Sequence, residues 1–84
     1  MKTDEIVGVI ESEQNSDKCF KFYLDSDALL IGMFVKGPDY EPLKKSNMWR
    51  FVPVADIPEW HKTNALKLTE LINGKLIVQI LPIR

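Results

Sequence analysis

The run Leu29–Lys36, LLIGMFVK, constrains the fold more than any other stretch of the chain. It is the longest apolar run in the first half, and it is rich in residues that favour strands. A short run that is apolar on both faces predicts a strand covered on both sides, which belongs in the middle of a sheet. Gly32 lies inside this run, and a glycine within a strand usually marks a bend or a close backbone approach. The sequence therefore predicts a central, bent strand around which the other elements are arranged.

The length and charge of the chain limit what it can build. Its 84 residues support one domain with a single modest core, and we assign residues 1–84 to that domain. The apolar share of 45% and the charged share of 27% are those of a globular protein. The formal net charge of −1 supplies no overall positive field that would attract a nucleic acid.

The cysteine count and the N-terminal stretch bear on the compartment. Cys19 is the only cysteine, which excludes an intramolecular disulfide and fits a reducing environment. The first residues include Asp4 and Glu5 and contain too short an apolar run for a signal peptide. No segment approaches the roughly 18 apolar residues that a membrane-spanning helix needs. We therefore expect a soluble, cytoplasmic protein that does not act in a membrane.

The first third of the chain predicts two strands and their turns. Residues 5–12, EIVGVIES, are apolar on both faces and contain Gly8, which predicts a first bent strand. The polar residues 12–18 predict a solvated hairpin loop. Residues 19–24 alternate between large apolar and smaller or polar side chains, as a half-buried strand does. With a tight turn at 25–27, these elements predict an antiparallel meander that leads into the central strand.

An irregular segment is followed by two further strands with a helix between them. Residues 37–47 contain two prolines and a glycine, which predicts a long loop and a first candidate for a functional surface. Residues 48–54 predict a strand that either ends at Pro53 or lies at an edge, because proline cannot donate to a ladder. The last segment, 75–83, is apolar on both faces and hazardous as an exposed edge. We expect it to pair with another strand or with a second copy of the chain, and to end at Pro82.

The stretch between these strands allows two interpretations. Residues 56–72 predict one helix, because the apolar side chains fall within an arc of roughly 140°. Asp56 is a suitable N-cap, and the Asn73-Gly74 pair supplies a left-handed stop. The competing interpretation takes Asn73-Gly74 as the two-residue turn of a hairpin between 66–72 and 75–81. We favour the helix because its cap and its phase agree independently.

The order of these elements predicts an α+β domain. We expect a strongly curved five-stranded antiparallel sheet or a small SH3-like barrel, in the order β-β-β-β-α-β, with one helix before the last strand. The predicted core consists of large apolar side chains from every element: Val7, Val9, Phe20, Phe22, Leu24, Leu30, Phe34, Phe51, Trp60, Leu68, Leu71 and Val78.

The inventory of catalytic residues is thin. Cys19 and His61 form the only possible thiol–imidazole pair and lie far apart in the sequence. A metal site would have to join His61, which the helix phase places at the edge of the apolar side, to Glu59 or Asp56. The four glycines are scattered, and none forms a phosphate-binding loop. We therefore expect a protein that is not an enzyme, with no catalytic residues, no metal and no cofactor.

One stretch combines aromatic and basic residues. Within eleven positions the chain carries Tyr40, Lys44, Lys45, Trp49 and Arg50. Bases stack on aromatic rings while basic groups follow phosphates, so this mixture is what a small barrel that binds single-stranded nucleic acid needs. It equally fits a peptide site, in which Tyr40 and Trp49 anchor apolar side chains and the basic rim selects acidic partners. Against both, Trp49 has the strand face and the size of a core residue.

These observations favour a binding protein over a catalyst. We expect a non-enzymatic interaction module that binds a protein partner or its own copy, the latter as a homodimer formed through the last strand. The alternative is a small barrel that binds single-stranded nucleic acid through the basic and aromatic residues. Salt separates the two hypotheses, because phosphate contacts give an affinity that falls steeply with added salt.

Overall fold

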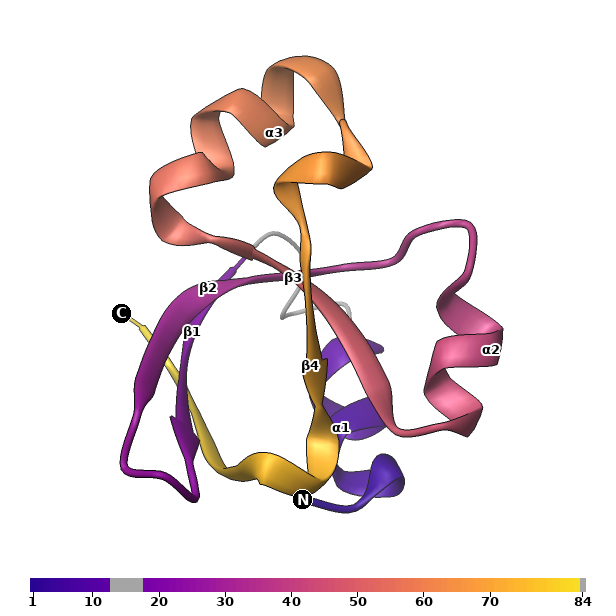
Figure 1. Cartoon of the computed structure of the whole chain (residues 1–84), viewed down its shortest axis with the longest axis vertical. Coiled ribbons are helices and arrows are strands. Elements are labelled where there is room, and N and C mark those ends of the chain that lie inside the picture. The colour runs from indigo at the N-terminus through magenta and orange to yellow at the C-terminus, as the bar shows by residue number, and fades with distance from the viewer. Residues whose placement is uncertain (13–17, 84) are drawn as a thin grey trace.

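The computed structural model describes residues 1–12 and 18–83, and these form a compact α+β arrangement (Figure 1). Five antiparallel strands make one sheet in the spatial order β4-β3-β2-β1-β5. The strands are β1 (Cys19–Leu24), β2 (Leu29–Val35), β3 (Met48–Pro53), β4 (Glu70–Asn73) and β5 (Ile77–Pro82). The helices are α1 (Thr3–Ile10), α2 (Tyr40–Lys45) and α3 (Ile57–Thr63), with 3₁₀ turns at Val54–Asp56, Leu66–Leu68 and Gly74–Leu76. Most of the predicted first loop, residues 13–17, lies outside the described residues.

The predicted central position is confirmed, because β2 lies in the middle of the sheet between β1 and β3. The predicted cover on both sides is incomplete, because Met33 is buried but Leu29 is 46% exposed. Gly32 of β2 pairs with Phe20 on one side and with Pro53 on the other. A Cβ atom at Gly32 would lie 2.3 Å from the Val52 carbonyl oxygen, a distance that real Cβ atoms do not adopt. This glycine therefore marks a close backbone approach between β2 and β3.

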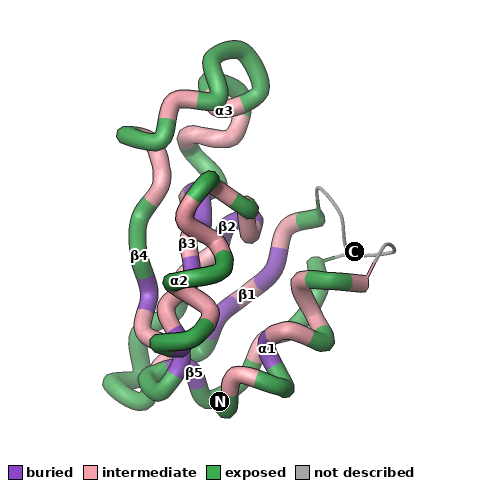
Figure 2. The backbone as a smooth tube through the Cα atoms, turned by 90° about the vertical axis from the view of Figure 1, so that its right-hand side faces the viewer, coloured by how far each residue is buried: buried purple, intermediate pink, exposed green. Residues whose placement is uncertain are grey.

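The predicted strands on either side of β2 are also confirmed. Figure 2 shows that buried and less buried positions alternate along β1, where Phe20 and Phe22 are buried. The turn that follows contains Asp27 in the left-handed conformation, with a φ of 67°. On the other side, β3 ends at Pro53, the residue that the sequence marks as unable to continue the ladder.

The predicted first strand, 5–12, is wrong, because most of this stretch forms helix α1. Ile6, Val9 and Ile10 fall within about 100° of one another on a helix, and all three pack in or against the core. The Glu5 side chain accepts a hydrogen bond of 3.0 Å from the backbone N–H of the residue before the helix. Burial of this stripe outweighs the strand preference of the β-branched residues in the same stretch.

The predicted loop 37–47 also contains regular structure, helix α2. Pro42 is the third residue of this helix, where a backbone N–H would have no partner within the helix, so the proline is tolerated. The Asp39 carbonyl oxygen accepts a hydrogen bond of 3.1 Å from Leu43 N–H. Asn47 then adopts a left-handed φ of 56°, which turns the chain into β3.

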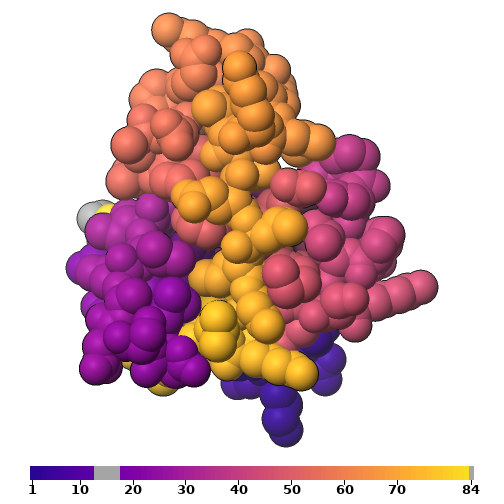
Figure 3. Space-filling view, viewed as in Figure 1, coloured from indigo at the N-terminus to yellow at the C-terminus, as the bar shows by residue number. Residues whose placement is uncertain are grey.

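The predicted helix 56–72 begins near the expected residue but ends nine residues early, because α3 spans Ile57–Thr63. Asn64 stops the helix in the left-handed conformation, with a φ of 51°, and its N–H donates to the Trp60 carbonyl oxygen at 2.8 Å. The residues that follow form a 3₁₀ turn and then β4. Together α3 and this turn form one end of the molecule (Figure 3).

The competing hairpin across Asn73-Gly74 is wrong as well. β4 and β5 lie at opposite edges of the sheet and do not pair with each other in the described part of the chain. The Asn73 side chain accepts a hydrogen bond of 3.0 Å from Lys75 N–H, and the chain enters a 3₁₀ turn. The last strand pairs with β1 and ends at Pro82, as predicted. The sheet is thus open, and the closed barrel is not formed by the described residues.

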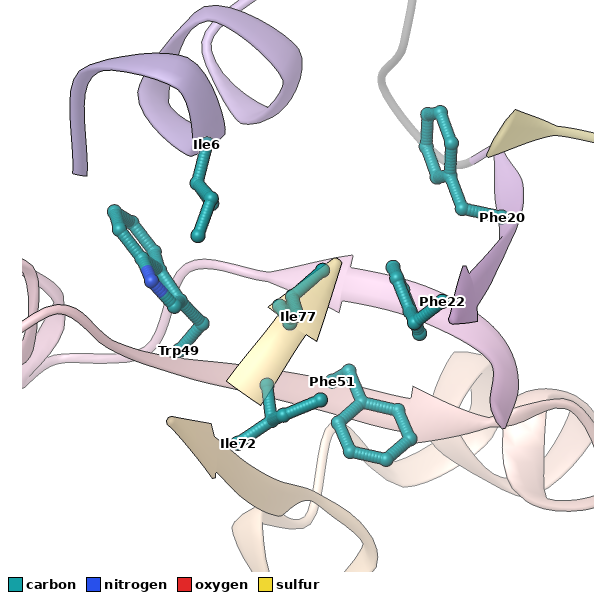
Figure 4. Packing of buried hydrophobic residues seen from close by; sticks show 7 residues of the cluster. All are labelled: Ile6, Phe20, Phe22, Trp49, Phe51, Ile72 and Ile77. Atoms are coloured by element: carbon teal, nitrogen blue, oxygen red, sulfur yellow. The ribbon is translucent and has the colours of Figure 1, made fainter. Parts of the chain in front are cut away.

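The two faces of the sheet differ in cover. We call the face that carries Phe20 and Phe22 the inner face and the opposite one the outer face. Figure 4 shows the buried cluster on the inner face: Ile6, Phe20, Phe22, Trp49, Phe51, Ile72 and Ile77. The Phe22 ring meets the rings of Phe34 and Phe51 edge-on, with centroids 4.9 Å and 5.7 Å apart. Helix α1 closes this face through Ile6, which is completely buried.

The predicted core is correct for part of its residues. Phe20, Phe22 and Phe51 are buried, and five more predicted residues pack against them half-buried: Val7, Val9, Leu24, Leu30 and Phe34. Leu71 and Val78 are exposed, and Trp60 and Leu68 are half-buried outside this cluster. Six further buried hydrophobic residues are not among the predicted core residues, namely Ile6, Met33, Trp49, Val52, Ile72 and Ile77. None of the helices in the described residues is long and apolar enough to cross a bilayer.

Candidate functional site

The structure brings the five predicted binding residues together where α2 packs beside β3. Tyr40, Lys44 and Lys45 lie on α2, and Trp49 and Arg50 lie on β3. Their side chains point to different surroundings, however, because Trp49 and Arg50 are neighbours on a strand and face opposite sides of the sheet. Trp49 and Arg50 therefore cannot contact a ligand on the same face of the sheet.

Trp49 belongs to the core. Its side chain is 1% exposed, and its indole N–H donates a hydrogen bond of 2.8 Å to the Asn47 side-chain oxygen. The Asn47 amide in turn donates to the Met1 carbonyl oxygen at 3.1 Å, which ties α1 to β3. A ring held in this way stabilises the inner face and has no open face on which a base could stack.

Tyr40 and Lys44 share one carboxylate. The Tyr40 hydroxyl and the Lys44 ammonium both donate to the same Glu11 oxygen, at 2.7 Å and 3.0 Å. The hydrogen bond from Tyr40, followed by that from Lys44, lowers the pKa of Glu11 below its usual value. Burial and the bond to Glu11 raise the pKa of Tyr40, so its hydroxyl stays protonated as a donor. The Lys36 ammonium also lies over the Tyr40 ring, 5.3 Å from its centroid.

Arg50 is held by a second carboxylate. Its Nε and Nη2 atoms donate to the two Asp39 oxygens at 3.0 Å and 2.6 Å, and its Nη1 donates to the Thr69 hydroxyl at 2.9 Å. This two-pronged pairing lowers the pKa of Asp39 and raises the pKa of Arg50. Of the three predicted basic residues, only Lys45 makes no ion pair within the described residues. Two of the three predicted basic residues, Lys44 and Arg50, are therefore already paired with carboxylates of the protein itself.

The residues considered for catalysis lie on different elements and differ in exposure. Cys19 is half-buried at the start of β1, whereas His61 is exposed on α3. The expectation that His61 lies at the edge of the core is wrong, because the side chain is exposed. Helix α3 ends at Thr63, so the later apolar residues that placed His61 on the apolar side are not part of the helix. Within residues 1–12 and 18–83, no group of three potential metal ligands comes together.

A second candidate surface lies on the outer face, where β2, β1 and β5 run side by side. The strand register aligns Leu29 with Tyr23 and Gln79, and it aligns Ile31 with Lys21 and Leu81. Beyond β5, the Ile83 N–H donates to the Cys19 carbonyl oxygen at 3.1 Å. Because side chains alternate along a strand, these residues project from one face. We call them the outer patch: Cys19, Lys21, Tyr23, Leu29, Ile31, Gln79, Leu81 and Ile83.

The outer patch exposes large apolar side chains. Leu29 is 46% exposed, Leu81 and Ile83 are 39% exposed, and Tyr23 is 36% exposed. Lys21 is the only charged residue of the patch, and it makes no ion pair within the described residues. A contiguous apolar surface with a polar rim is typical of an interaction site, whereas single exposed leucines are not.

The free edge of β5, by contrast, offers few main-chain groups. Pro82 has no N–H, and the register with β1 shifts between Tyr23 and Leu24. The Ile77 carbonyl oxygen accepts a hydrogen bond from the Met1 amino group. Proline, bulges and local cover are the devices that hinder strand addition at sheet edges. The face beside β5 therefore exposes more binding surface than the edge does.

The sequence contains a signal for the outer patch that the prediction did not use. Both the run 29–36 and the run 75–83 are apolar on two faces, so each needs cover on both sides. Helix α1 packs on the inner face, and on the outer face of β2 and β3 the residues Met33 and Val52 are buried, whereas Leu29 and Leu81 are not. A comparison of the apolar strand faces with the elements available to cover them would have indicated exposed apolar residues on the outer face of β1, β2 and β5.

Comparisons with protein-family models, with curated proteins and with solved structures found no match for this chain.

Proposed function

We propose that the protein is a non-enzymatic interaction module that binds another protein through the outer patch. The observation that carries this proposal is the exposure of Leu29, Tyr23, Leu81 and Ile83 on three neighbouring strands. Burying such side chains on binding releases water from apolar surface, which is the main favourable contribution in most protein associations. Tyrosine is also one of the residue types that most often anchor a partner, and Tyr23 lies in this patch beside Leu29.

The proposed SH3-like curvature of the sheet has one support. A flat sheet would hold its two edge strands about 19 Å apart, at about 4.8 Å between neighbours. Only the 3₁₀ turn Gly74–Leu76 connects edge strand β4 to edge strand β5. Such a link spans at most about 14 Å, so it favours a sheet that curls toward itself at this end.

Binding of single-stranded nucleic acid through α2 and β3 has less support. A stacking platform needs an accessible ring, and Trp49 is buried. Lys44 and Arg50 are already paired with Glu11 and Asp39. An affinity for a single-stranded oligonucleotide that falls steeply with salt would favour this alternative over a protein partner.

The experiment that tests the proposal measures the affinity of a defined probe. The probe is a blocked amphipathic helical peptide of about twelve residues, roughly three turns, with leucines on one stripe and a glutamine at the stripe's centre. We expect saturable binding to the wild-type protein. The double variant Leu29→Gln/Leu81→Gln should bind about tenfold more weakly or worse, because each lost anchor typically costs about 1 kcal/mol or more.

The matched control removes two exposed apolar residues that lie outside the outer patch. Val54 and Leu71 are both 49% exposed and lie away from β1 and β5, so Val54→Gln/Leu71→Gln lowers the surface hydrophobicity without changing the patch. This variant should bind the peptide like the wild type. An equal loss in both double variants, or no saturable binding to the wild-type protein, would contradict the proposed function.

A further inference from the structure

We propose that the partner presents a short amphipathic helix with a carboxylate in its apolar stripe, and that Lys21 pairs with this carboxylate. This inference rests on the proposed function, because it names the chemistry of the segment that the outer patch binds. Three properties of the patch carry it: its dimensions, its single central charge, and what that charge does to a second copy of the chain.

The dimensions of the patch fit one helix. Three strands at about 4.8 Å spacing span about 10 Å, and the four residue steps from Tyr23 to Cys19 span about 13 Å. A helix with its side chains is about 10–12 Å wide, and 13 Å is about two and a half turns. Helices are also the usual cover for the face of a sheet, as α1 shows on the inner face through Ile6.

The position of Lys21 determines the charge of that helix. In the strand register Lys21 stands between Ile31 and Leu81, in the middle row of the patch. No carboxylate among the described residues pairs with it. An entirely apolar helix docked here would cover the ammonium group without giving it a partner, which is unfavourable. A carboxylate at the centre of the helix supplies that partner and discriminates against segments without one.

The same charge argues against a second copy of the chain on this face. A two-fold axis through the centre of the patch would place two Lys21 ammonium groups against each other on an apolar background. An axis displaced from the centre would leave part of the patch uncovered. The patch is also small beside the roughly 800 Å² per partner that stable complexes bury. Its dimensions and charge therefore fit a short segment of a different protein.

The test compares three peptides that differ only at the central stripe position, which is Glu, Gln or Lys. At low salt we expect the Glu peptide to bind the wild-type protein about three- to tenfold more tightly than the Gln peptide, and the Lys peptide to bind worst. Added salt should reduce this difference. Lys21→Glu should reverse the order of the Glu and Lys peptides. Lys45→Glu, which changes an exposed lysine outside the patch, should leave the order unchanged.

A neutral variant separates the charge from the apolar contact. Lys21→Met removes the ammonium but keeps a long apolar side chain, so it should bind the Gln peptide at least as tightly as the wild type does. It should also lose the preference for the Glu peptide. These two results together would assign the selectivity to the Lys21 charge.

The remaining outcomes distinguish failure of this inference from failure of the proposed function. Equal binding of all three peptides, still weakened by Leu29→Gln/Leu81→Gln, would overturn the carboxylate pairing and leave the module intact. No binding of any peptide would overturn both. Light scattering that shows a dimer of the peptide-free protein, converted to monomers by Leu81→Gln, would assign the patch to a second copy and overturn the inference.

Discussion

The inner and outer faces of β1 consist of alternating residues of one strand, but their side chains differ in burial. Phe22 faces inward, is fully buried, and meets Phe34 and Phe51 edge-on. Its neighbour Tyr23 faces outward and is 36% exposed, in a row with Leu29 and Gln79. The difference lies in the cover, because α1 packs on the inner cluster. On the inner face these apolar residues are buried and stabilise the fold, whereas Tyr23 and Leu29 remain partly exposed on the outer face. Farther along the outer face, Met33 and Val52 are buried.

The largest effect is expected from truncating neighbouring residues on the two faces. Phe22→Ala should lower the free energy of unfolding by about 3–5 kcal/mol, because it removes a buried ring and leaves a cavity. Tyr23→Ala should lower it by about 1 kcal/mol or less, because its side chain is partly solvated. Urea unfolding followed by circular dichroism measures both. Similar losses in the two variants would mean that the outer face is also part of the core.

A smaller effect is expected at two glycines that the sequence placed in bent strands. Gly32→Ala should lower the free energy of unfolding by about 1–3 kcal/mol, because the added Cβ meets the Val52 carbonyl oxygen. Gly8 is exposed on helix α1, and a Cβ there meets nothing within 4 Å. Gly8→Ala should therefore raise the free energy of unfolding by about 0.5–1 kcal/mol.

The same unfolding measurement checks both glycine variants. A loss of stability in Gly8→Ala would contradict the assignment of residues 3–10 to a helix, and with it the cover of the inner face. An unchanged stability in Gly32→Ala would contradict the close approach of β2 and β3.

The smallest effect concerns the other half of the outer face, where Arg50 lies across from Val35 and Leu71. Pairing with Arg50 lowers the pKa of Asp39 below 3.8 in the folded state, so the unfolded chain binds this proton more readily. The pair therefore stabilises the fold fully above the ordinary pKa of aspartate, and this contribution is lost as the pH falls through the lowered pKa.

Asp39→Asn removes this pH dependence. The difference in unfolding free energy between the wild type and Asp39→Asn should be small, present at neutral pH, and shrink as the pH falls below about 4. Unfolding curves at several pH values measure it, with Glu59→Gln as a control outside the ion pair. A difference that grows toward low pH would contradict the pairing of Asp39 with Arg50.

The sequence predicted the elements whose signals are local. The alternation in 19–24 and the two-sided apolar run 29–36 gave correct strands, because burial pattern and strand preference agree there. In α1 the burial pattern and the strand preference disagree. The β-branched residues favour a strand, whereas packing of Ile6 in the inner cluster favours the helix. Helix α3 ends where Asn64 adopts the left-handed conformation. The sequence instead predicted the end at Asn73-Gly74, because that pair is the stronger helix-stop signal.

The candidate site was harder to predict than the fold, because a site depends on which side chains are left without cover. The sequence correctly grouped Tyr40 and Lys44. It could not show that the Glu11 carboxylate, 29 positions from Tyr40, accepts hydrogen bonds from both. The sequence allowed Trp49 to be either a core residue or a surface for stacking a ligand. Because Trp49 is buried in the structure, it is a core residue. The outer patch emerged only when the register placed Lys21 among apolar neighbours from two other strands.

The most direct test of the different roles of the two faces is a methyl-resolved NMR titration with the neutral helical peptide. Leu29 and Leu81 report on the outer face, and Leu30 and Ile80 report on the inner face of the same strands. We expect the methyl resonances of Leu29 and Leu81 to shift and saturate, while those of Leu30 and Ile80 stay in place. Shifts confined to Leu30 and Ile80, or to methyl groups of α3 alone, would contradict it.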